Sequence, residues 1–99
     1  MQKSRQYIVY ILTNRSRTLY IGVTGNIHRR MEAHRSRSVP GFASRYNLRE
    51  LVYYEETTDV ESAIRREKEL KGWRRDRKMG LIDSLNPEWR DLTRELLTG

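Results

Sequence analysis

The chain has 99 residues, which suffices for one domain with a single hydrophobic core. It contains 20 Lys and Arg against 13 Asp and Glu, an excess that favours a polyanionic partner, with nucleic acid ahead of an acidic membrane and simple solubility as the alternative. The absence of cysteine excludes a disulfide framework and a thiolate zinc site, and no apolar run is long enough for a membrane span.

The first half of the chain predicts a β-hairpin followed by a helix. Residues 7–12 and 18–23 are β-branched and aromatic runs typical of strands. The turn residues Asn14 to Arg17 between them form a loop too short for a parallel crossover, so the two strands are predicted to be antiparallel. Asn26 is a good helix N-cap, and a helix is expected from Ile27 to about Arg35.

The second half predicts one more strand and further helices. The long helix is capped either by Thr58, which has capping-box spacing to Glu61, or by Asp59, and it breaks at Gly72 or Gly80. In chain order the expected elements are a basic loop over 36–47, a strand over 48–55, a long helix over 60–73, a short helix over 78–85 that Asn86-Pro87 ends, and a last helical turn or two over 91–97.

This order of elements predicts an α+β fold, with a three-stranded, mostly antiparallel sheet flanked by helices. We expect a single domain over residues 1–99, with a core from about 5 to 85. Because the sequence shows no signal peptide, a cytoplasmic protein is the default expectation.

Polar residues interrupt the apolar stripe of the first helix. Ile27 and Met31 define the inward face, and Arg30 and His34 stand three and seven residues from Ile27 on the same face. An arginine and a histidine one turn apart at the margin of a buried face form a positive pair that is aimed at the sheet.

The long helix carries an interruption of the opposite sign. Val60, Ala63, Ile64, Leu70 and Lys71 are expected to mark its inward stripe, and Glu67 stands where that stripe should continue. A carboxylate among apolar neighbours costs several kcal/mol unless it is paired, protonated or bound to a cation. Two interpretations stay open: an ion pair to Arg30 or a nearby lysine, and a metal ligand.

Two tyrosines and a glycine of the hairpin are expected on one face of the sheet. Tyr10, Tyr20 and Gly22 all have even numbers, and in a bulge-free hairpin with an even register they share a face. Taken alone, each tyrosine is better explained by packing than by chemistry. Glycine inside a strand often marks the close approach of a backbone or ligand. The hypothesis is therefore a site where these residues meet Arg30, His34 and Glu67.

The same residues resemble the GIY-YIG nuclease superfamily. The segments that carry the resemblance are Ile8-Val-Tyr10, Tyr20-Ile-Gly22 after a short loop, Asn26 to His34, and Arg65 to Lys71. The resemblance covers nearly the whole chain and is closest to small stand-alone bacterial members, which are related to the amino-terminal nuclease domain of excinuclease C. It implies DNA phosphodiester hydrolysis with one divalent cation, Mg²⁺ or Mn²⁺, in DNA repair or processing.

The resemblance also implies a role for each site residue. Tyr10 would be the general base or its partner in activating the attacking water, and Tyr20 would hydrogen-bond the water or the scissile phosphate. Arg30 would stabilise the pentavalent phosphorane, since its fork donates two hydrogen bonds. His34 would relay a proton, and Glu67 would hold the metal, because one carboxylate is enough for Mg²⁺.

Three further points qualify this expectation. A phenol with a reference pKa of about 10 needs a nearby cation to act as a base at neutral pH. Ile8 replaces the glycine of the first motif, and Thr24 stands where several relatives carry a lysine, which weakens that expected source of positive charge. Asn86 is a candidate match to an asparagine near the end of the family's motifs.

Basic residues after the first helix and along the long helix are expected to hold DNA by its phosphates. Residues 65–78 include eight basic and three acidic side chains, and Tyr46, Phe42 and Trp73 could stack on bases, with packing the stronger interpretation for Trp73. Nothing predicts base readout in a groove, so binding should be structure-directed or weakly specific. The alternative function is a non-catalytic nucleic-acid-binding module of the same fold. The candidate DNA contacts are Arg29, Arg35, Arg37, Arg45, Arg66, Lys71 and Arg74.

Overall fold

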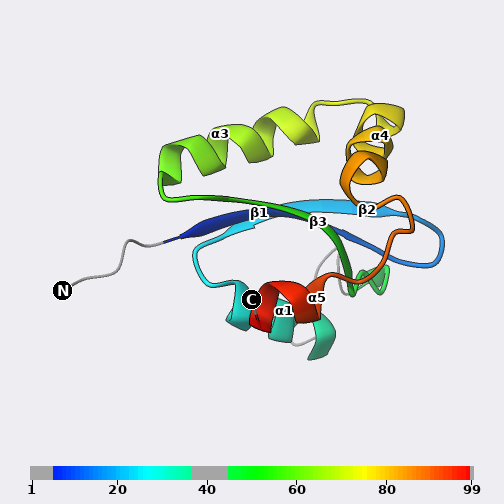
Figure 1. Cartoon of the computed structure of the whole chain (residues 1–99), viewed down its shortest axis with the longest axis horizontal. Coiled ribbons are helices and arrows are strands. Elements are labelled where there is room, and N and C mark those ends of the chain that lie inside the picture. Colours follow the sequence, from blue (N-terminus) through cyan, green and yellow to red (C-terminus); the bar gives the residue numbers. More distant parts are fainter. Residues whose placement is uncertain (1–5, 37–44, 99) are drawn as a thin grey trace.

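The computed structural model describes residues 6–36 and 45–98, and it confirms the predicted α+β class. Arg37 and Phe42, which the sequence suggested as DNA contacts, lie outside the described residues. The elements are β1 (Tyr7–Thr13), β2 (Leu19–Thr24), α1 (Ile27–Ser36), β3 (Glu50–Thr57), α3 (Val60–Lys71), α4 (Arg75–Leu85) and α5 (Thr93–Thr98) (Figure 1).

The three strands form one antiparallel sheet in the order β2-β1-β3. In the hairpin Tyr10 pairs with Gly22 and Leu12 with Tyr20, so the two tyrosines are diagonal neighbours on one face, as the even numbering predicted. The pairing of β1 with β3 shifts register between Ile11 and Leu12, and this irregularity lies outside the hairpin. The strand order makes β1 the central strand and β2 and β3 the two edge strands.

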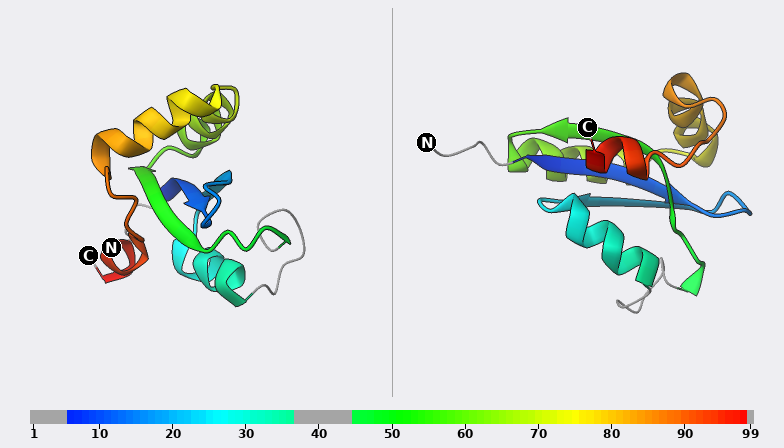
Figure 2. Two further views of the ribbon diagram at one scale, coloured as in Figure 1. Left: turned by 90° about the vertical axis from the view of Figure 1, so that its right-hand side faces the viewer. Right: turned by 60° about the horizontal axis from the view of Figure 1, so that its bottom comes forward.

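Each face of the sheet packs against its own pair of helices. Helices α3 and α4 cover one face, while α1 and α5 lie side by side on the other (Figures 1 and 2). The first core holds Val9, Ile11, Leu70 and Ile82 among its buried residues, and the second holds Tyr10, Leu12, Met31 and Leu51. The alternation of strand residues between the two faces assigns each side chain to one of these cores.

Local sequence signals set the helix ends. Asn26 caps α1, because its Oδ1 accepts the backbone N–H of Arg29 at 3.1 Å. At α3 the cap is Asp59, whose carboxylate accepts the N–H of Ser62 at 3.2 Å, so the competing choice of Thr58 was wrong. The break after α3 comes at Gly72, whereas Gly80 lies inside α4, which begins three residues earlier than expected.

The inward stripe of α3 differs from the expected one. Ala63 and Leu70 are buried, but Val60 and Ile64 are each 42% exposed and Lys71 is exposed. Ala63 and Leu70 are seven residues apart and therefore lie on the same face of the helix, which packs on the sheet. Val60 and Ile64 lie at the margins of that face. Glu67 keeps its place beside the buried stripe, with its side chain 15% exposed.

The segment after α4 is part of the packed structure beyond residue 85. Trp89 belongs to the first core, and Leu92 and Leu96 pack against the second. The backbone N–H of Leu92 donates to the carbonyl of Leu51 at 2.7 Å, which ties this segment to β3.

None of the helices in the described ranges, 6–36 and 45–98, is long and apolar enough to cross a membrane.

Candidate active site

Tyr10 occupies a place that only glycine on the neighbouring strand permits. Its side chain is 0% exposed, and its ring lies over Gly22. A Cβ added to Gly22 would stand 2.5 Å from the Tyr10 hydroxyl oxygen and 2.6 Å from Cζ, far inside van der Waals contact. Gly22 is therefore a point of close approach, as the sequence indicated, but the approaching group is the side chain of Tyr10 and not a backbone or ligand.

Three rings meet at this point. The Tyr10 hydroxyl and Nε2 of His34, from α1, are 3.2 Å apart and hydrogen-bonded. The ring centroids lie 6.3 Å apart for Tyr10 and Tyr20, 6.0 Å for Tyr10 and His34, and 5.6 Å for Tyr20 and His34. The edge-on contacts of the imidazole with both phenols fix its orientation. Two tyrosines and the histidine predicted from separate segments thus form one cluster.

Burial controls the protonation of this cluster. The pKa of Tyr10 is raised, mainly because burial disfavours the phenolate; the neighbouring Tyr20 and Glu67 act in the same direction, and Arg30 opposes them. The pKa of His34 is lowered from 6.5 by burial and by Arg30. Tyr10 is therefore a neutral phenol and His34 a neutral imidazole near pH 7, because burial outweighs the lowering effect of Arg30 on the pKa of Tyr10.

Glu67 reaches this cluster from the opposite side of the sheet. Helix α3 packs across β1 and β2 on the face that Tyr10 does not occupy, yet the Glu67 charge contributes to the raised pKa of Tyr10. Glu67 Oε2 lies 2.7 Å from Nζ of Lys71, the kind of ion pair that the sequence left open.

The donor set around Glu67 suits one hydrated divalent cation. No group of three or more His, Cys, Asp and Glu side chains is placed to cage a metal within residues 6–36 and 45–98. A single carboxylate fits Mg²⁺ or Mn²⁺, which keep several waters and take phosphate oxygens from a substrate. It does not fit a zinc site, which needs three or four protein ligands.

A hollow opens on the surface beside Tyr20. It has a volume of about 230 Å³ and is lined by Leu19, Tyr20, Ile21, Lys71 and Lys78. Two ammonium groups on flexible stems beside a phenol make it suitable for an anion. Lys78 was counted in the basic run of the sequence but not singled out, because only the turn from α3 into α4 brings it alongside β2.

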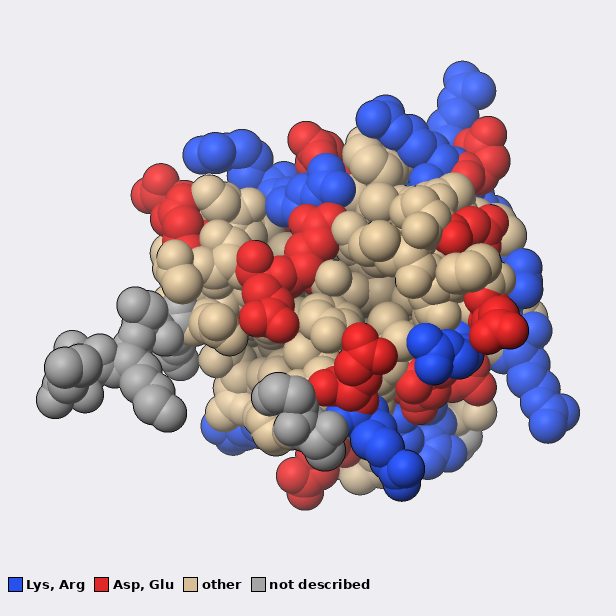
Figure 3. Space-filling view, in the orientation of Figure 1, with Lys and Arg blue, Asp and Glu red and all other residues tan. Residues whose placement is uncertain are grey.

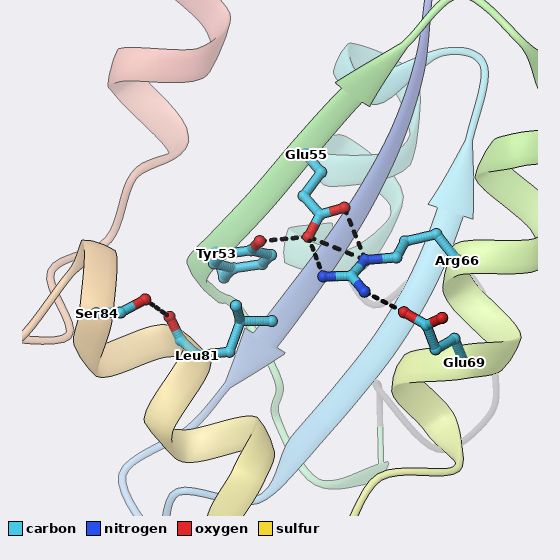
Figure 4. Close-up of polar contacts among 6 residues, drawn as sticks. All are labelled: Tyr53, Glu55, Arg66, Glu69, Leu81 and Ser84. Carbon is cyan, nitrogen blue, oxygen red and sulfur yellow. Dashed lines mark hydrogen bonds and ion pairs between the residues drawn. The ribbon is translucent and has the colours of Figure 1, made fainter.

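Two of the arginines predicted to hold DNA are engaged with carboxylates. Arg66 lies between Glu55 of β3 and Glu69 of its own helix, with the Tyr53 hydroxyl also on Glu55 (Figure 4). Although burial alone would raise the pKa of Glu55, hydrogen bonds from Arg66 and Tyr53 hold it below its usual range. Arg35 bonds to Asp91 at 2.5 Å and to Thr93 at 2.9 Å.

The other candidate contacts are exposed. Arg29, Arg45 and Arg74 are open to solvent, as is Tyr46 at 44%. Trp73 packs against the first core with the guanidinium of Arg77 3.8 Å from its ring centre, which agrees with the packing interpretation. On the face of the molecule in Figure 3, basic and acidic side chains intermingle. That face therefore does not offer the uniform positive surface expected of a phosphate track.

Thr24 and Asn86 serve local structure. The Thr24 hydroxyl accepts the N–H of Asn26 at 3.0 Å and donates to the carbonyl of the same residue, closing the turn between β2 and α1. Asn86 is 2% exposed, and its amide donates to the carbonyls of Val52 and Arg90. These bonds give Asn86 a structural position, tying the C-terminal segment to β3.

Fold and site together have the form of a small nuclease-type domain. The chain matches the family described as the GIY-YIG catalytic domain over residues 6–80, and it belongs to that family. The members of the family are endonucleases, generally dependent on a divalent metal ion.

A similar fold occurs in the solution NMR structure of the UPF0213 protein BH0048 from Bacillus halodurans. That structure is 26% identical in sequence, with a TM-score of 0.58, and the similarity covers 90% of this chain and 95% of the other. No curated protein matches the chain.

Proposed function

We propose that this protein is a divalent-metal-dependent endonuclease that hydrolyses DNA phosphodiester bonds at the β2 edge of its sheet. The observation that carries the proposal is the cluster of the Tyr10, Tyr20 and His34 rings, together with the mostly buried carboxylate of Glu67, whose charge acts on Tyr10. A largely buried carboxylate has no packing role that an apolar residue would not fill better. Structure-directed or weakly specific cleavage in DNA repair or processing suits a domain that offers no element for base readout.

The two tyrosines take different parts in this proposal. Tyr10 is fully buried, so we assign it a positioning role: its hydroxyl and Nε2 of His34 are hydrogen-bonded at 3.2 Å. Tyr20 is partly exposed, so we assign to its hydroxyl the contact with the attacking water or a phosphate oxygen. Of the two roles that the sequence left open for Tyr10, the structure favours the partner over the general base.

The charged residues stabilise negative charge as it develops. Arg30, exposed on α1 and close enough to act on Tyr10, can donate two hydrogen bonds to the equatorial oxygens of the phosphorane. Glu67 would hold Mg²⁺ or Mn²⁺, which supplies charge neutralisation at the phosphate when bound. His34 stays neutral near pH 7 and so can accept a proton within the cluster.

The test is a cleavage assay with Mg²⁺ or Mn²⁺ on duplex, flap, branched and single-stranded DNA. We expect Glu67→Gln to lower the cleavage rate by at least about 10²-fold, the size of effect seen when one group that stabilises the transition state is removed. Glu69→Gln is the matched control, since Glu69 is on the same helix but pairs with Arg66. Equal loss in both variants, or equal activity in Glu67→Gln and wild type, would contradict the proposal.

A non-catalytic nucleic-acid-binding module of the same fold is the second candidate. It is favoured by one observation, that Lys71 already neutralises Glu67 without any metal. In that case DNA would bind in a salt-sensitive manner that Glu67→Gln leaves unaltered, and no substrate in the panel would be cut with either metal.

A further inference from the structure

Lys71 stands between two places that both require a positive charge. Its ammonium is 2.7 Å from the Glu67 carboxylate, and the Lys71 side chain is 56% exposed against 15% for Glu67. The same lysine lines the hollow that Tyr20 and Lys78 share. The side chain of Lys71 is flexible, and one ion pair to Glu67 holds its ammonium. The ammonium can therefore turn from Glu67 to the hollow without any movement of the backbone.

A divalent cation bound to Glu67 would replace Lys71 as the positive partner of the carboxylate. The carboxylate is largely withdrawn from water and needs a positive partner, which the ammonium now supplies. A metal ion on the same carboxylate would repel the ammonium at close range, and no other described acidic side chain is ion-paired to Lys71. The hollow is the adjoining surface, and a DNA phosphate there would offer the ammonium a new partner.

We propose that Lys71 is a resident counter-ion of Glu67, which competes with the divalent cation for the carboxylate and is released to a substrate phosphate when the cation binds. This inference rests on the proposed function, because it takes Glu67 as the metal ligand. It assigns Lys71 a second task beyond DNA contact: the protein without metal keeps its site neutral, and metal binding adds a phosphate contact.

The first measurement is Mn²⁺ binding to the untagged protein without DNA, by isothermal titration calorimetry. We expect Lys71→Met to bind Mn²⁺ about two- to tenfold more tightly than wild type, because a competing ion pair of this exposure is lost. Lys78→Met is the matched control, since it removes the same charge from the same hollow without touching Glu67. Its Mn²⁺ affinity should stay within about twofold of wild type. Equal affinities in Lys71→Met and Lys78→Met would overturn the competition.

The second measurement is the salt dependence of binding to a fluorescent DNA duplex, with and without Ca²⁺. Each phosphate contact contributes about 0.9 to the slope of log affinity against log salt. Lys71→Met should reduce the slope by about 0.9 with Ca²⁺ and by much less without it, whereas Lys78→Met should reduce the slope equally in both conditions. If Lys71→Met loses the same slope in both conditions, Lys71 is an ordinary phosphate contact and the proposed release is wrong.

Glu67→Gln separates this inference from the proposed function. Loss of Mn²⁺ binding in Glu67→Gln, with unchanged binding in Lys71→Met, would leave the metal site in place and refute only the competition. Unchanged Mn²⁺ binding in Glu67→Gln would instead show that the metal does not bind at Glu67, which contradicts the proposed function itself.

Discussion

Gly22→Ala is expected to disturb the site at its most crowded point. The added Cβ would lie 2.5 Å from the Tyr10 hydroxyl oxygen, 2.6 Å from Cζ and 3.1 Å from Cε1, and the Tyr10 side chain is 0% exposed. The ring has no solvent to move into, so it must shift against the second core and away from His34. Overpacking of this kind costs about 1–3 kcal/mol. In a domain of this size that lowers Tm by on the order of 5–20 °C.

Thermal unfolding followed by circular dichroism measures this effect, with Gly80→Ala as the control. A Cβ at Gly80 meets nothing within 4 Å, and Gly80 lies inside α4, so alanine there should stabilise the protein by about 0.5–1 kcal/mol. In a Tyr10→Phe background, which removes the closest contact, Gly22→Ala should cost less. If Gly22→Ala unfolds at the wild-type temperature and keeps the wild-type cleavage rate, Tyr10 does not lie over Gly22 in solution.

Three further predictions follow from other contacts. The pKa of His34 is below its ordinary 6.5, so as pH falls the unfolded chain takes up a proton before the folded protein does. The free energy of unfolding should therefore decline below about pH 6.5, until the pH passes the folded pKa of His34. A series of Tm values against pH measures this decline, which should be missing in His34→Gln. Asn86→Ala should lower the free energy of unfolding in urea by about 1–3 kcal/mol, because it leaves the Val52 and Arg90 carbonyls without their donor; an effect under about 0.5 kcal/mol would contradict this. Arg66→Met should lower Tm by a few degrees, at about 1 kcal/mol for a partly exposed ion pair, yet leave DNA affinity in an anisotropy titration within about twofold of wild type; a larger loss of affinity would return Arg66 to the DNA-binding surface.

The hairpin half of the site could be predicted from the sequence because strand geometry leaves little freedom. The even residue numbers alone put Tyr10, Tyr20 and Gly22 on one face of the sheet. Side chains of a strand alternate between two faces, so a shift of register by one residue would move all of a strand's side chains to the other face. The helical spacing likewise put Met31 and His34 on the face of α1 that meets the sheet, whereas Arg30, expected on the same face, is exposed. Both inferences use contacts between residues near in sequence or in a regular register.

The rotation of α3 and the partners of its arginines could not be predicted in this way. Val60 and Ile64 are apolar and compete with Ala63 and Leu70 for the inward direction, and the helical period does not decide between stripes less than a third of a turn apart. Arg66 pairs with Glu55, eleven residues away, and Arg35 with Asp91, fifty-six away. A surplus of positive charge predicts a polyanionic partner. Only the folded structure shows which basic side chains are already paired with carboxylates of the same chain.

The two edges of the sheet differ in a way that favours one direction of approach for DNA. Helices α3 and α4 pack on one face of the sheet and α1 and α5 on the other, which leaves the strand edges as an approach for a phosphate. At β3 the C-terminal segment bonds to Leu51, and the carboxylates of Glu55 and Asp91 hold Arg66 and Arg35 in ion pairs. At β2 the described side chains around the hollow include Lys71 and Lys78 and no carboxylate. Lys71 is held by Glu67, so Lys78 is the cation of this hollow that can take a phosphate directly, and DNA should approach at the β2 edge beside Tyr20.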